Sequence, residues 1–494
     1  MTQWRGEAAA RAGVYFLKLS APVERMIGIP APNVCVSPDI KGKVAAMSER
    51  ILRFVCGALI GALALAAALP LPSVAAARIL KLDECIAIAQ RNNPEIAIAG
   101  EGYRKAGSNV LMNYGRLLPG FNLDFYLGHM YYGPSSVQYD TQGRPVQSQG
   151  FDYPNYNFGL SSDMTLFDGG GTINRVRAAM SGRDAAREDL KYRKDIVSAR
   201  VIRAYYDLVR NRMLLRVQEE GVDLAKRNLE RTEALLKVGS ATKADVLKAR
   251  VRHSNTRLSM IQATNASALA GEELAALLRM DGADSIDVDT TMAIQFVEPD
   301  AAAEVQYAMT HRSDLRSLEH GIKSAGAAVA AARSGWLPSL GASFNYRWND
   351  RKMAENLNFF ENEYMWGINA YLSFNIFDRF LTSSNVSMAK ADYRIAEYGL
   401  DKAKLDAAKE IRGLVLTMKQ AREYIAVATE TVEQAEEDLR LAEERYRVGA
   451  GTMLETIDAQ VALTQAKADV IKAKTEYLIA VADLARATGR TTYQ

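Results

Sequence analysis

The 494-residue sequence has little cysteine and histidine, the residues that build disulfides and many metal and catalytic sites. It has three cysteines, and only Cys85 lies beyond the first 77 residues, which leaves no internal disulfide and no cysteine metal site after that point. The four histidines are scattered without metal-ligand spacing, and there is no Ser-His-Asp order and no phosphate-binding loop. We therefore expect no enzyme, no metal and no other cofactor.

An excess of positive charge is also missing from most of the chain. The formal net charge is +3, but residues 1–77 hold 8 of the 61 basic and 4 of the 58 acidic residues, so the remainder is near −1. This balance removes any electrostatic argument for nucleic acid as a partner.

Residues 1–77 are predicted to be a leader and signal peptide. No charge occurs from Phe54 to Ala77, the segment is largely apolar, Arg50 and Arg53 precede it, and small residues end it. A basic head, an apolar middle and a small-residue cleavage pattern are typical of a secretory signal. An uncleaved anchor is the alternative, because about 20 apolar residues span a bilayer.

Two further expectations concern this leader. Met47 lies just before the basic head and is a candidate translation start, which would make residues 1–46 a misassigned leader. Cys56 precedes the apolar run instead of following it, so we expect an exported protein without a lipid anchor.

The rest of the chain repeats one plan twice, in residues 78–300 and 301–494. Three marks recur in the same order, and internal repeats of this kind decide the architecture. The matches are Leu166-Phe167-Asp168 with Ile376-Phe377-Asp378, Val238-Gly239-Ser240 with Val448-Gly449-Ala450, and Asp245 with Glu455 at an offset of 210, then Leu118-Pro119 with Leu337-Pro338 and Asn93 with Arg312 at 219.

Each half contains a predicted β-hairpin, near 120–167 and near 340–377. Apolar and polar residues alternate there, for example from Trp366 to Ile376, and period two is a strand signal. Polar stretches at 129–155 and 349–364 are the predicted hairpin loops. The alternation fits strands of a membrane barrel and equally an ordinary sheet over a core.

Long helices are predicted around these hairpins. No proline occurs between Pro154 and Pro299 or after Pro338, and residues 170–237 alone would form a helix about 100 Å long. Apolar residues seven apart predict a seam that packs against neighbouring helices. They are Leu208, Leu215, Val222, Leu229 and Leu236.

In this doubled order the residues resemble the TolC family of outer-membrane efflux proteins, from about Leu80 to Gly489. The marks are Leu82-Asp83-Glu84-Cys85 leading to Asn92-Asn93-Pro94-Glu95, the paired Leu-Pro and Phe-Asp, and Tyr446-Arg447-Val448-Gly449 before the last helix. Asp168-Gly169-Gly170 keeps the family's glycines after Phe-Asp, whereas Asp378-Arg379-Phe380 departs from them.

The resemblance implies a mainly α fold with membrane β-strands. In the family, a homotrimer joins four strands from each chain into a twelve-stranded transmembrane β-barrel, and long antiparallel helices form a periplasmic α-barrel. It further implies an outer-membrane exit duct of a tripartite efflux or type I secretion system, surrounded by outer-membrane lipid. Its partners would be a periplasmic membrane-fusion adaptor and an inner-membrane pump or ATP-driven exporter. A soluble periplasmic coiled-coil scaffold or adaptor is the alternative.

The turns at 238–242 and 448–452 are predicted to join pairs of long helices. Glycine allows a left-handed helix stop, and Thr242 and Thr452 are candidate caps of the following helices. Helix termination alone explains these glycines. The resemblance adds that the turns are the tips that dock the adaptor, namely Val238, Gly239, Ser240, Val448, Gly449 and Ala450.

Three acidic residues are candidates for the channel entrance. Glu455 and Asp458 are three apart, hence on one helix face, and in a trimer would give six carboxylates that favour cations. Acids in a first helical turn also simply suit the helix dipole. Asp245 matches an acid that, in the family, latches the closed entrance to an arginine whose place is taken here by Gly451, which leaves Arg447 or Lys243 as candidate partners.

Overall fold

The computed structural model describes residues 78–134, 138–146, 151–280, 286–350 and 364–490, which belong to one compact unit. The predicted signal peptide, the candidate start at Met47 and most of the second hairpin loop lie outside the described residues. Within the described part of the chain, no helix combines the length and hydrophobicity needed to cross a membrane.

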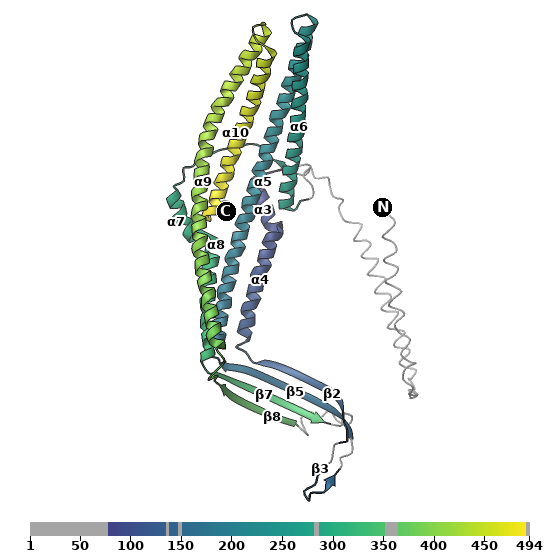
Figure 1. Cartoon of the computed structure of the whole chain (residues 1–494), viewed down its shortest axis with the longest axis vertical. Coiled ribbons are helices and arrows are strands. Elements are labelled where there is room, and N and C mark those ends of the chain that lie inside the picture. Colours follow the sequence, from purple (N-terminus) through teal and green to yellow (C-terminus); the bar gives the residue numbers. More distant parts are fainter. Residues whose placement is uncertain (1–77, 135–137, 147–150, 281–285, 351–363, 491–494) are drawn as a thin grey trace, which may run out of the picture. The chain divides into compact units, whose positions relative to one another are not determined.

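The helices follow the same order in both halves, and this confirms the doubled plan (Figure 1). Matching helices have equal lengths of 11, 67 and 36 residues in three of the four pairs. The first half contains α3 (Leu82–Asn92), α4 (Pro94–Gly115), α5 (Gly171–Lys237) and α6 (Lys243–Leu278). The second contains α7 (Ala301–His311), α8 (Ser313–Arg333), the 3-10 turn η2 (Ser334–Trp336), α9 (Leu381–Arg447) and α10 (Met453–Thr488).

Four strands form one antiparallel sheet in the order β2-β5-β7-β8. They are β2 (Gly120–Tyr132), β5 (Phe151–Phe167), β7 (Ser339–Asp350) and β8 (Tyr364–Ser373). Between β2 and β5 in the sequence, the short strands β3 (Gln138–Tyr139) and β4 (Pro145–Val146) pair with each other. The predicted loop 129–155 is wrong at both ends, since residues 129–132 and 151–155 pair as strands. The alternation that predicted a strand to Ile376 also runs too far.

The two faces of this sheet differ in polarity. Cross-strand partners lie on the same face, so each row of the register can be read across the sheet. One row joins Leu123, Leu160, Tyr346 and Trp366, and the next joins Phe121, Ser162, Phe344 and Ile368. The opposite face has the rows Asn122, Ser161, Asn345, Gly367 and Asp163, Ser343, Asn369. One face is therefore apolar across all four strands, and the other is mostly polar.

The long helices pack side by side in two antiparallel pairs, α5 with α6 and α9 with α10, and α10 also packs against α5. Figure 1 shows the two turns at the same end of these pairs. The shorter helix α8, which precedes β7 in the sequence, packs against both α5 and α9.

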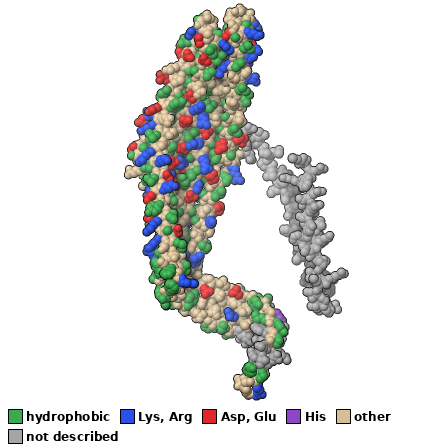
Figure 2. Space-filling model, viewed as in Figure 1, with side chains coloured by type: hydrophobic (Ala, Val, Ile, Leu, Met, Phe, Trp, Pro, Cys, Tyr) green, Lys and Arg blue, Asp and Glu red, His purple; other side chains and the backbone are tan. Residues whose placement is uncertain are grey.

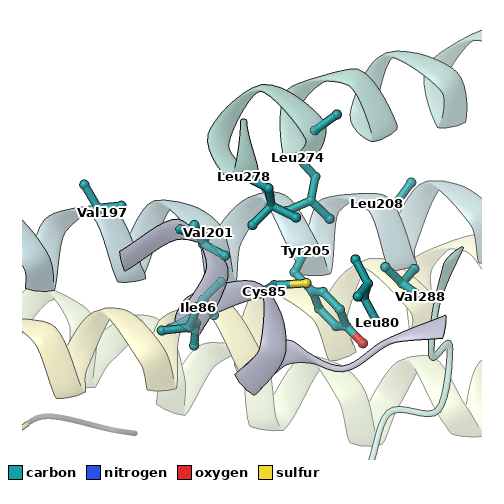
Figure 3. Close-up of a cluster of buried hydrophobic side chains, with 14 of the residues drawn as sticks. Leu80, Cys85, Ile86, Val197, Val201, Tyr205, Leu208, Leu274, Leu278 and Val288 are labelled. Atoms are coloured by element: carbon teal, nitrogen blue, oxygen red, sulfur yellow. The ribbon is translucent and has the colours of Figure 1, made fainter. Parts of the chain in front are cut away.

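Two buried clusters hold the helices together near the start of each half. The first lies beneath the parallel pair β1 (Arg78–Leu80) and β6 (Ile286–Val288) and is shown in Figure 3. It places Val201, Leu208 and Leu274 where the second cluster has Ile411, Met418 and Leu484, at the offset of 210. Similar side chains thus fill equivalent places in both repeats.

Cys85 belongs to the first cluster and is fully buried. Burial raises the pKa of its thiol to about 11, so the thiol is neutral and inert at neutral pH. Its role is packing.

The predicted seam on α5 is only partly correct. Leu208 is buried, but Leu236 is 37% exposed, and nearer the turn the buried residues are Val217, Ala225 and Thr232. The stripe moves because α5 has α10 as a second neighbour there: the Thr232 hydroxyl lies 4.0 Å from the sulfur of Met453. A seven-residue spacing predicts one line of contact along a helix, and α5 has a second line of contact with α10.

The start of each repeat is tied to the end of its last helix. The Asn93 amide donates to the carbonyl of Leu277 at 3.4 Å, and Arg312, in the matching position, donates to the carbonyl of Ala487 at 3.0 Å. These bonds satisfy carbonyls that a helix end leaves free. Burial opposes the charge of Arg312, but hydrogen bonds to Asp314 and Glu410 outweigh it and raise its pKa.

Candidate functional site

The turns between the paired helices have the same backbone structure. Gly239 and Gly449 have φ of 78° and 75°, the left-handed region that glycine adopts without strain. The amide of Ser240 donates to the carbonyl of Leu235, and that of Ala450 to Arg445, which closes each helix in a Schellman turn. The predicted left-handed stops are confirmed.

The first turn is followed by a complete capping box. The Thr242 hydroxyl accepts from the amide of Asp245, and the Asp245 carboxylate accepts from the amide of Thr242 at 3.1 Å and from its hydroxyl at 2.7 Å. The hydroxyl bond is the main reason that the pKa of Asp245 is lowered. Asp245 therefore stabilises its own helix end.

The second turn uses its matching acid differently. The Thr452 hydroxyl caps α10 by accepting from the amide of Glu455, as predicted. The Glu455 carboxylate accepts from the Thr452 hydroxyl at 3.4 Å, and it also faces the guanidinium of Arg445 across the turn at 3.7 Å. Asp458 follows three residues later on α10 and is exposed. The two acids thus share a helix, and Glu455 has a cation beside it.

Gly451 makes room for this arrangement. A Cβ at position 451 would lie 3.0 Å from the Cβ of Arg445 and 3.2 Å from a carboxylate oxygen of Glu455, closer than ordinary contact. Among the described residues, neither Arg447 nor Lys243 forms an ion pair with Asp245.

Sequence reasoning missed Arg445 because it lies ten residues before Glu455, on the other side of the turn. The absence of a side chain at Gly451 was the available signal. It also missed that Val238 and Val448 are 73% and 72% exposed, so each turn presents one apolar side chain to solvent.

The departure from the family's glycines changes the residues but not the turn. Gly169 and Gly170 leave β5 with φ of 67° and 80°, and Arg379 and Phe380 adopt φ of 58° and 64° after β8. The second repeat thus builds the same left-handed pair from residues for which it is unfavourable.

The fold is that of bacterial outer membrane channels. The crystal structure of the CmeC outer membrane channel of Campylobacter jejuni superposes with a TM-score of 0.73 at 18% identity, covering 83% of this chain and 85% of CmeC.

A family model described as "Outer membrane efflux protein" matches residues 85–278 and 305–490, one segment in each repeat. The chain belongs to this family. It is 24% identical to the pyoverdine export outer membrane protein OpmQ of Pseudomonas putida over 83% of this chain and 86% of OpmQ. It is 26% identical to protein CyaE of Bordetella pertussis over 60% of this chain, and spans 62% of the length of CyaE.

Proposed function

We propose that this protein is the outer-membrane exit duct of a tripartite efflux or type I secretion system, through which small molecules or proteins leave the periplasm without chemical change. In this proposal the chain is exported by its signal peptide, is not lipidated, and spans the outer membrane of a Gram-negative cell as a homotrimer. Its partners are a periplasmic adaptor and an inner-membrane pump or ATP-driven exporter.

The observation that carries the proposal is that the sheet and the helices are both open on the same two sides. Within the part of the chain that the structure describes, β2 and β8 are the outer strands of the sheet, each with one unpaired edge, and α6 and α9 are the outer members of the row of long helices. One rotation that brings α9 of one copy beside α6 of the next also brings β8 toward β2. Repeated, it closes a ring, and three copies give twelve strands with no free edge.

The sheet has the faces that such a barrel needs. Large apolar side chains on one face are well exposed in the single chain, including Ile368 at 72% and Leu123 at 66%. The opposite face carries Asn345 and Asn369, whose side chains hydrogen-bond to each other. Lipid on the first face and water on the second would satisfy both.

The two turns are the proposed docking points for the adaptor. Val238 and Val448 are exposed apolar side chains on rigid Schellman turns, and a fixed apolar residue is a good anchor for a helical partner. The flanking residues Gly239, Ser240, Gly449 and Ala450 are exposed as well.

We further propose that Glu455 and Asp458 line the entrance, so that three copies present six carboxylates. Replacing both with Ala should weaken cation selectivity and block by multivalent cations, because a crowded ring of carboxylates attracts cations. Recordings in planar bilayers measure both quantities. Unchanged selectivity and block would exclude this role, and Asp438→Ala, an exposed acid on α9, is the matched control.

Cell fractionation tests the proposed location. The protein should be recovered in the outer-membrane fraction, its N-terminal sequence should begin near residue 78, and it should carry no acyl chain by mass spectrometry. Recovery in the soluble periplasmic fraction would instead support a coiled-coil scaffold.

A further inference from the structure

The two helical turns carry opposite charge although they have the same backbone structure. Residues 226–252 contain eight basic and three acidic residues, whereas the matching residues 436–462 contain three basic and seven acidic residues. Figure 2 shows blue side chains around the turn that precedes α6 and red ones around the turn that follows α9. Nothing in the turn geometry requires this difference.

The basic residues of α6 lie beside an exposed apolar stripe. Val246, Ala249 and Thr256 are buried toward α5, whereas Leu247, Val251 and Leu258 are more than half exposed. Along the edge of this stripe Lys243, Arg250 and Arg257 recur every seven residues, which places them on one line of the helix. Arg250 also reaches Glu233 of α5 at 2.9 Å, and the other two form no ion pair among the described residues.

The outer face of α9 has the complementary pattern. Ala435, Leu439 and Ala442 are buried toward α10, and the opposite face carries glutamates every seven residues, with Leu441 45% exposed among them. Among the described residues, Arg440 is the cation that pairs with this row, at 2.6 Å from Glu437 and 2.9 Å from Glu444. The glutamates are Glu423, Glu430, Glu437 and Glu444.

The two rows match in spacing as well as in sign. Counted from Ser240 and Ala450, the basic residues lie 3, 10 and 17 positions from the turn, and three of the glutamates lie 6, 13 and 20 positions away. The stagger is three residues for every pair, about 4.5 Å along the helices, which long side chains can span.

We propose that α6 of one copy binds α9 of the next through this charged seam. Lys243, Arg250 and Arg257 pair with Glu444, Glu437 and Glu430 of the next copy, and the apolar stripe of α6 faces Leu441 of that copy between them. The seam rests on the proposed ring and specifies how its copies recognise one another: each copy offers a basic edge and an acidic edge, so only head-to-tail contacts form.

Charge reversal in two arms tests the seam. The first arm is Lys243→Glu with Arg257→Glu, and Glu at position 243 also suits the N-terminus of α6, so folding should persist. The second arm is Glu430→Lys with Glu444→Lys, and a third protein combines all four changes. Lys226→Glu with Asp438→Lys reverses exposed charges outside the two rows and is the matched control. Native mass spectrometry of the full-length protein in detergent measures the ratio of oligomer to monomer.

Each single arm should lower this ratio about tenfold at low salt, and the combined protein should return to within about twofold of the wild type, because the pairs re-form with exchanged signs. Single arms that behave like the control, or a combined protein no better than either arm, would overturn the seam alone. A wild-type protein that is monomeric in every detergent would overturn the ring and the seam together.

Discussion

Gly451 is the residue whose small size the second turn needs most. Gly451→Ala should loosen that turn by about 1 kcal/mol, because the new Cβ would crowd the Cβ of Arg445 at 3.0 Å and the backbone nitrogen of Tyr446 at 3.2 Å. Hydrogen exchange of the amides from Arg445 to Thr452 should become about fivefold faster. Gly413→Ala, within α9 where a Cβ meets nothing within 4 Å, should be neutral or stabilising. If Gly451→Ala slowed amide exchange in its turn, as Gly413→Ala can do in α9, the predicted crowding at position 451 would be contradicted.

Asp195 on α5 should make stability depend on pH. Burial, with a smaller contribution from Asp314, raises the pKa of its carboxyl from 3.8 to about 6, against the opposing effect of Arg486 and of Lys191 and Lys194. The folded state therefore binds the proton more tightly than the unfolded state, and the contribution of Asp195 to the free energy of unfolding rises as the pH falls from about 6 to about 4.

Asp195→Asn should accordingly raise the melting temperature near pH 7.5, by an amount equivalent to about 1 kcal/mol because the carboxyl is partly exposed, and flatten the profile at lower pH. Thermal unfolding followed by circular dichroism at several pH values measures this. An equal loss of stability at every pH would show that the carboxylate has a structural role instead.

Residue patterns predicted local features better than contacts between distant residues. Thr242 and Thr452 were identified as caps because a cap depends only on the next three residues. The pair of Arg445 and Glu455 depends on how two helices meet across a turn, and the tie between Arg312 and Ala487 joins residues 175 positions apart. No local rule contains such contacts.

At the scale of elements, the turn from β8 into α9 carries strain that its counterpart avoids. Arg379→Gly should stabilise the protein by about 1 kcal/mol, because glycine adopts the observed φ of 58° freely. Phe380→Gly should stabilise the protein less than Arg379→Gly, because it removes the contact between the rings of Phe380 and Phe377, whose centroids are 5.7 Å apart. The melting temperature in detergent measures both.

Gly169→Ala is the opposite experiment in the first repeat. It combines a φ of 67° with a Cβ only 2.8 Å from that of Leu337, so it should destabilise by more than 1 kcal/mol. If Arg379→Gly also destabilised the protein, contacts of the Arg379 side chain would outweigh the backbone strain, and the prediction would be wrong.

The bounds of helices and strands could be predicted where a single rule applied, and the prediction was wrong where two rules competed. The 67-residue length of α5 was predicted almost to the residue, because Gly170 and Gly239 bound an uninterrupted helical composition. The predicted loop at 129–155 makes β2 too short, because residues 129–132 pair with residues 151–154 of β5. Pairing across a hairpin overrides the composition of its ends.

For the whole molecule, the polarity of the sheet faces gives a matched pair of substitutions. Ile368 and Asn369 are neighbours on β8 with side chains on opposite faces. Ile368→Lys should sharply lower recovery in the outer-membrane fraction, because a lysine facing lipid costs about 2–4 kcal/mol, and Asn369→Lys should be recovered normally. Equal effects of the two substitutions would be inconsistent with lipid on the apolar face.

The equal lengths of α5 and α9, and of α6 and α10, have a consequence for how this chain can change. Removing one residue from one long helix would draw its turn back by about 1.5 Å and rotate it by about 100° relative to the other turn. The two turns would no longer present their valines at one level to a common partner. Substitutions can therefore accumulate within the helices, while insertions and deletions are confined to the sheet end, where the nine-residue difference between the repeats is found.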